Sequence, residues 1–398
     1  MGLFDDRTIP DYQNLNLIIH NQKAKQLALD MARESAILLK NSDNILPLDI
    51  NKLNSIAVIG PNADQVQFGD YMWTNDNEYG ITPLQGILKI CGDKLKINYA
   101  KGCDIHSQDK SGFDEAVSIA LRSDIALIFV GAMSGAPGRP WPNSVSGESF
   151  DLSDIALTGV QEDLIKAVKA TGKPVVVILV AGKPSAIPWI KDNCDAIIVQ
   201  WYAGEQQGTA IAEILFGLVN PSGKLNVSFP KSVGHLPVYY NYYPTDKGFY
   251  NIRGAVDKPG RDYVFSDPFP VWAFGTGLSY TSFDYQDMVV SGDVFNKDQI
   301  CRIIVTIKNI GQRDGKEVVQ LYVRDKVSSV VTPIKELKRF SKVNIKSGET
   351  VQVLFELPMN ELSLWDENMK EVVEPGEFDL QIGTASDQIL LSKTIKVI

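Results

Sequence analysis

Residues 125–131, IALIFVG, form an uninterrupted run of apolar residues that ends in glycine. Similar short runs occur at 55–60 (SIAVIG), 174–180 (PVVVILV) and 196–201 (AIIVQW), and a more polar strand candidate lies at 95–100 (LKINYA). Strands that are buried on both faces of a parallel sheet lack the usual alternation of apolar and polar residues. These runs therefore predict a parallel sheet with both faces covered.

Apolar residues at helical spacing lie before and between these strand candidates. The expected helices cover residues 22–40, 83–91, 111–122, 158–170 and 206–217. Alternating strands and helices predict an open, mostly parallel α/β sheet with helices on both faces. Ligands of such sheets bind beyond the carboxyl ends of the strands, which directs attention to the loops that follow them.

The loop at 132–154 follows the strand candidate 125–131 and contains the stretch SVSGESFDLSD at 144–154. Long loops without regular structure often carry function, and a glutamate in partly apolar surroundings can act as a general acid. Glu148 is the candidate acid, and Trp141 could form an apolar wall beside it. The alternative interpretation is a solvated loop charge that favours the start of the next helix, and the residues alone favour this alternative.

A second candidate site is the stretch GDYMWTNDNEYG at 69–80, which follows the strand candidate 55–60. Trp73 lies there with two tyrosines among carboxylates. Aromatic faces beside hydrogen-bond acceptors suit sugar rings, which have apolar C–H faces and hydroxyl rims. A packed loop without function is the alternative interpretation.

The composition of the sequence changes near residue 220, where a segment rich in proline, glycine and tyrosine predicts an ordered connector. From residue 283 onward, short alternating strands separated by turns predict an antiparallel sandwich of immunoglobulin or fibronectin type III kind. The expected division is a linker at 1–21, an α/β domain at 22–230, the connector at 231–284 and an all-β sandwich at 285–398.

Composition excludes several classes of partner. The chain has 398 residues and a formal net charge of -9, without a block of basic residues, so we expect no nucleic-acid partner. A membrane helix needs about 20 apolar residues, and no run approaches that length, so we expect no membrane partner. The opening MGLFDDRTIPDY does not have the pattern of a secretory signal, which leaves the compartment open.

Generic cofactor and metal motifs are missing from the sequence. There is no glycine-rich dinucleotide or phosphate loop, no HExxH and no GxSxG, so we expect no cofactor and no metal site. Only three histidines occur, which disfavours a Ser–His–Asp triad. Cys91, Cys103, Cys194 and Cys301 occur singly, and either buried thiols or a Cys91–Cys103 bridge fits this spacing. Catalysis by carboxylate side chains is therefore the remaining possibility among these kinds of chemistry.

Ten stretches in order along the chain together resemble one family. They include ARESAILLKNSDNILPL, IAVIGPNA, TGKPVVVILVAGKP, WYAGEQQGTAIAEILFGLVNPSGKLNVSFP, VYYNYYPT, FGTGLSYTSFDY and VVEPGEFDLQIG. The chain resembles the C-terminal part of glycoside hydrolase family 3, the β-glucosidase and β-xylosidase group. The resemblance implies an α/β sandwich domain followed by a fibronectin-III-like domain, without the (β/α)8 barrel that precedes them in the family.

The resemblance also implies a retaining hydrolysis of terminal β-linked sugars, with a nucleophilic aspartate in the barrel and an acid/base glutamate in the α/β domain. The family pattern E-x-x-D-R followed by L-x-L-P-x-x-Q is matched by Glu148, Asp151, Leu157 and Gln161. Leu152 and Thr158 replace its arginine and proline. Glu148 is therefore the expected acid/base, and Trp73 resembles an aromatic residue of the leaving-group subsite.

Three hypotheses follow from the sequence. The chain is a β-glucosidase-like portion of a retaining glycosidase, inactive alone, whose partners are a β-linked oligosaccharide or glycoside and a barrel domain in the same or a separate chain. A β-xylosidase specificity is the nearest alternative. A non-catalytic carbohydrate-binding or scaffolding module is the second, and a stand-alone α/β enzyme of another class is the third. We also expect an apolar face where the barrel would pack, with self-association into a homo-oligomer.

Overall fold

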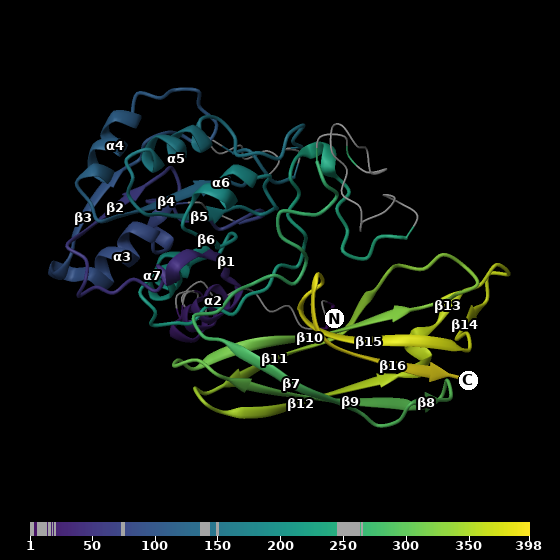
Figure 1. The fold of residues 1–398 in the computed structure, drawn as a ribbon. Coiled ribbons are helices and arrows are strands. Elements are labelled where there is room, and N and C mark those ends of the chain that lie inside the picture. Colours follow the sequence, from purple (N-terminus) through teal and green to yellow (C-terminus); the bar gives the residue numbers. More distant parts are fainter. Residues whose placement is uncertain are drawn as a thin grey trace.

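The computed structural model describes residues 4, 5, 14, 17, 19, 21–72, 76–135, 144–148, 151–244, 263 and 266–398. These residues form an α/β domain and a separate β-sandwich (Figure 1). The predicted fold class, a mostly parallel sheet followed by a fibronectin-III-like sandwich, is confirmed.

The α/β domain is built on a six-stranded sheet with the order β1-β6-β5-β4-β2-β3. Its strands are β1 (Ile37–Asn41), β2 (Ser55–Ile59), β3 (Lys96–Ala100), β4 (Ile125–Gly131), β5 (Val175–Val180) and β6 (Ala196–Val199). All neighbours are parallel except β1, which pairs antiparallel with β6 at the edge. Every residue of β2, β4, β5 and β6 is buried, which explains their continuous apolar sequences.

Strand β1 corrects the predicted helix at 22–40. Helix α2 (Gln22–Ser35) ends earlier, and the next three apolar residues, Ile37, Leu38 and Leu39, are almost completely buried in β1. An apolar triplet fits either periodicity over such a short length. Pairing with β6 favours the strand. As a strand, residues 37–41 bond to the backbone N–H and carbonyl groups along the edge of β6, which a further turn of helix α2 would leave without these partners.

Helices cover both faces of the sheet. On one face α4 (Phe113–Leu121), α5 (Gln161–Lys169) and α6 (Pro188–Asn193) bury side chains such as Ala120, Leu164 and Ile190 against the sheet. On the other, α3 (Pro83–Cys91) and α7 (Gln207–Leu215) bury Ile87 and Ile211. Short 3-10 turns are η1 (Ser42–Asn44), η2 (Asn77–Tyr79), η3 (Gly92–Lys94), η4 (Gly204–Gln206), η5 (Val233–His235) and η6 (Met359–Leu362).

The sandwich consists of a three-stranded sheet, β12-β9-β7, that packs on a five-stranded sheet, β11-β10-β15-β16-β8. The strands are β7 (Phe283–Val290), β8 (Val294–Phe295), β9 (Ile300–Asn309), β10 (Gly315–Asp325), β11 (Glu336–Ile345), β12 (Thr350–Pro358), β15 (Gly376–Ala385) and β16 (Gln388–Val397). A small ribbon of β13 (Leu364–Trp365) and β14 (Glu371–Val372) completes it. Strand β9 alternates buried and outward residues, as expected for a sandwich.

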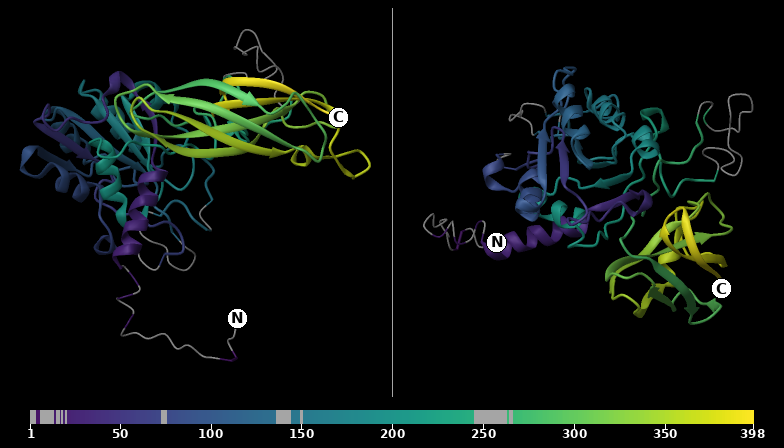
Figure 2. Two further views of the ribbon diagram at one scale, coloured as in Figure 1. Left: turned by 90° about the horizontal axis from the view of Figure 1, so that it is seen from below. Right: turned by 60° about the vertical axis from the view of Figure 1, so that its left-hand side comes forward.

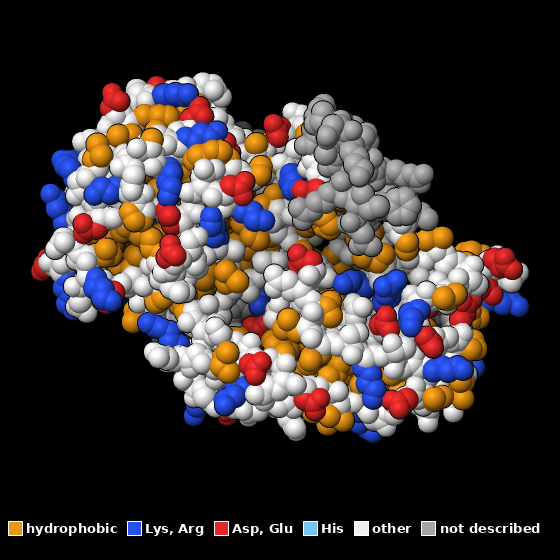
Figure 3. Space-filling view, in the orientation of Figure 1, with side chains coloured by type: hydrophobic (Ala, Val, Ile, Leu, Met, Phe, Trp, Pro, Cys, Tyr) orange, Lys and Arg blue, Asp and Glu red, His pale blue; other side chains and the backbone are white. Residues whose placement is uncertain are grey.

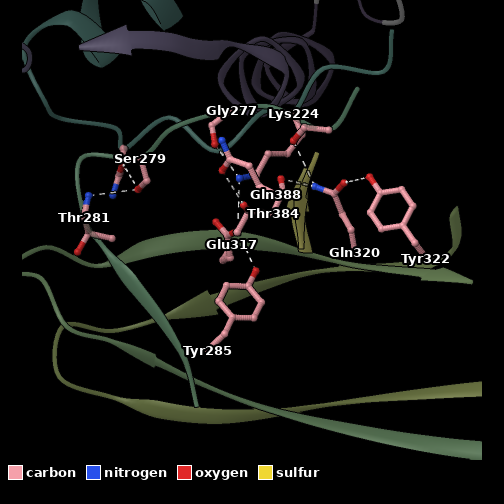
Figure 4. A network of polar contacts seen from close by, with 12 residues as sticks. Lys224, Gly277, Ser279, Thr281, Tyr285, Glu317, Gln320, Tyr322, Thr384 and Gln388 are labelled. Atoms are coloured by element: carbon pink, nitrogen blue, oxygen red, sulfur yellow. Dashed lines mark hydrogen bonds and ion pairs between the residues drawn. The ribbon is translucent and has the colours of Figure 1, made fainter. Parts of the chain in front are cut away.

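A buried ion pair joins the end of the α/β domain to the sandwich. The Lys224 ammonium lies 3.3 Å from a Glu317 carboxylate oxygen, and their side chains are only 11% and 4% exposed. Lys224 also donates to the Gly277 carbonyl oxygen at 2.7 Å, and the Tyr285 hydroxyl donates to Glu317 at 3.0 Å (Figure 4). Burial raises the pKa of Tyr285, so its phenol remains a donor. This network fixes the connector to strand β10.

Three further features bear on the sequence-based expectations. The four cysteines are free and buried, so Cys91 and Cys103 are not bridged. Among the described residues, no helix is both long and apolar enough to span a bilayer. On the face that Figure 3 shows, basic and acidic side chains are interspersed rather than gathered by sign.

Removal of the Glu317 charge tests the junction. Glu317→Gln leaves Lys224 buried without a counter-charge, and breaking a buried pair in this way costs about 3 kcal/mol or more. We expect a clear decrease in the urea midpoint of unfolding. The matched control is Glu356→Gln, because its pair with Arg302 is 51% and 58% exposed and such surface pairs contribute about 1 kcal/mol or less. Equal losses for both variants would contradict the assigned role.

Candidate functional site

The strand order places one crevice at the carboxyl edge of the sheet. Strand β2 lies between β3 and β4, so the chain runs outward to β3 and then crosses back to β4. Loops that follow two adjacent strands diverge at such a topological switch point, and ligands of open α/β sheets bind there. The loops after β2 and after β4 are the two candidate sites of the sequence, and the fold brings them together.

The loop after β4 is paired with itself near both of its ends. Ser134 and Ser146 form a parallel bridge, the Val145 N–H donates to the Met133 carbonyl at 2.9 Å, and the Gly135 N–H donates to the Ser146 carbonyl at 2.8 Å. These bonds join residues 133–135 to residues 145 and 146 and fix both to each other. Glu148 comes two residues after the bridge, so its backbone starts from a defined position.

Gly147 determines how Glu148 leaves this bridge. Its φ is +112°, in the region that favours glycine, and a Cβ here would lie 2.0 Å from the Gly135 carbonyl oxygen. No other residue fits without moving the loop backbone. The glycine of the stretch SVSGESFDLSD is thus required by a close backbone approach, and it turns the exposed Glu148 side chain outward.

Tyr71, from the loop after β2, donates its hydroxyl to the Glu148 carboxylate. Tyr71 has a φ of +57°, unusual for a residue with a side chain, and its ring is 75% exposed. The hydrogen bond to Glu148, assisted by the carboxylate charge, raises the pKa of the Tyr71 phenol. The phenol therefore stays protonated and holds the carboxylate across the switch point.

A buried polar layer lies beneath this pair. The hydroxyls of Ser146 and Tyr202 are 2.6 Å apart, and burial raises the pKa of Tyr202, with the nearby Asp70 charge adding to the effect. The Asp70 Oδ1 atom is buried and, within the described part of the chain, has no hydrogen-bond partner. A buried carboxylate oxygen without a donor is costly to the stability of the folded domain.

Gln161, the first residue of α5, fixes the root of the Glu148 loop. Its amide oxygen accepts from the Gly131 N–H at 2.8 Å, and its amide nitrogen donates to the carbonyls of Gly131 at 2.9 Å and Ile105 at 2.8 Å. The side chain is fully buried. One amide thus connects the end of β4, the loop after β3 and the start of α5.

Thr158 and Leu152, the two residues that depart from the family pattern, differ in their surroundings. Thr158, in place of the expected proline, donates its hydroxyl to the Ile105 carbonyl at 2.6 Å and so joins the same contact as Gln161. Leu152 is half-buried in place of the arginine. Asp151 instead acts on Lys183, where burial lowers the pKa of the ammonium and the Asp151 charge opposes that shift.

The structure describes one of the three site residues that the sequence predicts. Glu148 lies at the carboxyl edge of the sheet, as its position after β4 implied. Trp73 and Trp141 lie outside the described residues. Tyr71 is one of the two tyrosines near Trp73 in the sequence, and its contact with Glu148 depends on a strand order that the sequence does not display. In the described ranges, no group of three or more His, Cys, Asp or Glu residues could hold a metal ion.

A phenol titration tests the contact between Tyr71 and Glu148. In Glu148→Gln the phenol loses its charged acceptor, so we expect the pKa of Tyr71 to fall toward the ordinary value for tyrosine. The ultraviolet titration of each protein, minus that of the same protein carrying Tyr71→Phe, isolates this phenol from the other tyrosines. Glu78→Gln is the control, and in this variant the pKa of Tyr71 should stay as in the wild type. An unchanged titration in Glu148→Gln would show that the two side chains do not meet in solution.

Comparison with known proteins gives a consistent result over the whole chain. Residues 36–280 match the model of the glycosyl hydrolase family 3 C-terminal domain, and residues 317–386 match that of a fibronectin type III-like domain. A β-xylosidase of Formosa agariphila is 40% identical over 381 residues, which cover 94% of this chain and 50% of that protein. A periplasmic β-glucosidase of Salmonella typhimurium is 36% identical over 98% of this chain and 52% of its own length.

A solved structure agrees with these relatives. A β-glucosidase from Erythrobacter marinus superposes with a TM-score of 0.87 at 34% sequence identity, covering 100% of this chain and 53% of that one. The chain spans about half the length of the curated relatives that it matches. Its sheet order, sandwich and sequence agree with one another, and the chain belongs to glycosyl hydrolase family 3.

Proposed function

We propose that this chain is the C-terminal portion of a retaining β-glycosidase and that Glu148 is its general acid/base. The observation that carries the proposal is an exposed carboxylate at the topological switch point, held by the Tyr71 hydroxyl across two loops. Relatives that are named β-glucosidase and β-xylosidase support the reaction class.

Retaining hydrolysis needs two carboxyl groups about 5–5.5 Å apart, one as nucleophile and one as acid and then base. Glu148 takes the second role: it protonates the leaving oxygen and later removes a proton from water. Asp70 does not supply the first, because its Oδ1 atom is buried beneath Gly147 rather than presented to a substrate. We therefore place the nucleophile in a barrel domain that docks on this chain, and we assign Trp73 and Trp141 to the leaving-group side of the sugar.

The surface where that domain would dock lies beside the Glu148 site. We define the α2 face by the exposed side chains of Leu27, Met31, Tyr71 and Met72. Met31 and Met72 both line an apolar hollow of about 510 Å³ between α2 and the loop after β2. Helix α2 lies at the border of the α/β domain in both views of Figure 2. An apolar face continuous with the site suits a domain that closes over it.

Helix α2 is held firmly enough to present this face. The Arg33 guanidinium binds both carboxylate oxygens of Glu213 in α7, at 2.6 and 2.7 Å. Glu34 forms ion pairs with Lys316 and Lys342 of the sandwich. These contacts use the inner side of the helix, so Leu27 and Met31 are left outward as a fixed docking surface.

Reconstitution tests the catalytic proposal. The chain is fused to, or mixed with, the part of the Formosa agariphila relative that lies outside the match. Activity on aryl β-glucosides and aryl β-xylosides should appear only with the added part. In Glu148→Gln we expect a loss of about 10²- to 10⁴-fold on phenyl glycosides, which need protonation of the leaving group, and a much smaller loss on dinitrophenyl glycosides, which do not.

Asp154→Asn is the matched control, because this exposed carboxylate of the same loop caps Ala156 through a contact that asparagine preserves. It should leave both activities in place. Activity of the chain alone would contradict the proposal that the nucleophile lies in another domain. Equal losses on good and poor leaving groups in Glu148→Gln would contradict the acid role. Sugar binding without hydrolysis in the reconstituted protein would favour the non-catalytic module.

The ratio of the two activities separates the two specificities. The relative with 40% identity is named a β-xylosidase, which favours aryl β-xylosides as the second candidate substrate. A higher kcat/KM of the fused protein on the β-xyloside would assign β-xylosidase specificity to the chain. A higher kcat/KM on the β-glucoside would assign β-glucosidase specificity.

The α2 face should make the isolated chain associate with itself. Leu27→Lys with Met31→Lys places two charges on this face, so we expect the apparent mass in light scattering to fall toward that of a monomer. The same double variant should weaken reconstitution. Val327→Lys is the control, since Val327 is 81% exposed on the distant sandwich. A wild-type chain that is monomeric at high concentration would contradict the expected association.

A further inference from the structure

A second cavity lies between the connector and the sandwich. Its volume is about 470 Å³, within the range of small-ligand pockets. The described lining residues come from the connector at 235–242 and 268–273, from the segment before β11 and from the turn between β15 and β16. We call it the connector pocket. None of these residues belongs to the loops that carry Tyr71 and Glu148, so the proposed catalytic site does not account for it.

The walls of the connector pocket are braced by bonds between segments that are distant in the sequence. The Ile334 N–H donates to the Tyr242 carbonyl at 3.0 Å, and the Leu337 N–H donates to the Tyr240 hydroxyl at 3.1 Å. The Tyr240 ring stacks on Phe274 with centroids 4.3 Å apart. A cavity with fixed walls binds a ligand without first ordering its own side chains.

The polar groups of the pocket carry compensating charges. The Lys335 ammonium donates to the Ser386 carbonyl oxygen at 2.8 Å and has three N–H groups in all. Burial lowers the pKa of Lys335, and the charge of Asp387 opposes that shift. A cation and an anion at one end of a pocket offer donors and acceptors to a neutral polar ligand, whereas a phosphate or a carboxylate would meet repulsion from Asp387.

The pocket lining also includes accessible aromatic residues. The Tyr239 side chain is 65% exposed and Phe269 is 36% exposed, although both line the cavity. Aromatic rings left at a pocket rim provide apolar area that a ligand can cover at low entropic cost, because their side chains have few rotatable bonds. A lining that has both aromatic faces and partners for hydroxyl groups suits a pyranose ring, which has apolar C–H faces and a hydroxyl rim.

We propose that the connector pocket is a second carbohydrate-binding site, which takes a pyranose unit of a β-linked oligosaccharide on Tyr239 with Lys335 and Asp387 at its hydroxyls. The site goes beyond the catalytic proposal, since it needs neither Glu148 nor a partner domain. A purely apolar ligand is disfavoured because it would desolvate the Lys335 and Asp387 charges without giving them partners. The site would hold a longer glycan while its end is processed elsewhere.

Calorimetric titration of the 398-residue chain with cellobiose and with xylobiose tests this site. We expect a Kd in the millimolar range, which corresponds to about 4 kcal/mol. Tyr239→Ala should weaken binding at least fivefold, and Lys335→Met should do the same. Tyr239 is exposed enough for its variant to fold. Tyr243→Ala is the matched control, because this exposed connector tyrosine lines a different cavity, and it should bind as the wild type does.

The other outcomes decide against the site. Absence of binding for both disaccharides overturns it, and so does equal binding by Tyr239→Ala and the wild type. Phenol provides an apolar probe: if phenol binds in a Tyr239-dependent way and the disaccharides do not, the cavity is not a carbohydrate site. Glu148→Gln should leave disaccharide binding to the connector pocket unchanged, so failure here and failure of the catalytic proposal are separate results.

Discussion

The Gln161 side-chain amide is the contact on which the site depends. It is completely buried, bonds both backbone groups of Gly131 at the end of β4, and donates to the Ile105 carbonyl in the loop after β3. Without it, the N–H and the carbonyl of Gly131 would lose these bonds at a buried strand end, and an unsatisfied buried polar group costs about 1–3 kcal/mol. Because the bonds hold the point where β4 leaves the sheet, they also set the origin of the loop that carries Glu148.

From that fixed origin the loop reaches Glu148 by close backbone contacts rather than by a packed core. The Ser134–Ser146 bridge closes the loop, and the positive φ of Gly147 directs the next residue outward. Tyr71, also at positive φ, meets it from the neighbouring strand's loop. The positive φ of Tyr71 is a backbone cost that the rest of the domain sustains, and such costs gather at functional sites.

Much of the fold was predictable because buried parallel strands produce continuous apolar runs that the sequence displays directly. β1 was not predictable, because Ile37–Leu39 fits a helix as well as a strand and only the exposed backbone edge of β6 decides between them. The position of Glu148 at the sheet edge followed from its place after β4. Its contact with Tyr71 did not, because it requires β2 and β4 to be neighbours, and strand order is set by tertiary packing.

The family pattern and the hydrogen-bond geometry explain different residues of the site. Gln161 matches a position of that pattern, and its bonds to Gly131 and Ile105 explain why a glutamine is needed there. Thr158 departs from the pattern, yet its hydroxyl bonds the same Ile105 carbonyl that Gln161 binds. The connector was predicted to be ordered because its many aromatic rings need contacts, but no pattern in the sequence predicted the pocket that they form with the sandwich.

The central claim is that Glu148 completes an active site whose other carboxylate lies on a second domain. A crystal structure of the chain joined to that domain, with a fluorinated glycoside trapped on the nucleophile, tests this most directly. The account predicts a separation of about 5–5.5 Å between the Glu148 carboxyl group and the nucleophilic carboxyl group, with the Tyr71 contact retained. A Glu148 side chain directed away from the trapped sugar, with another carboxylate at that distance, would contradict it.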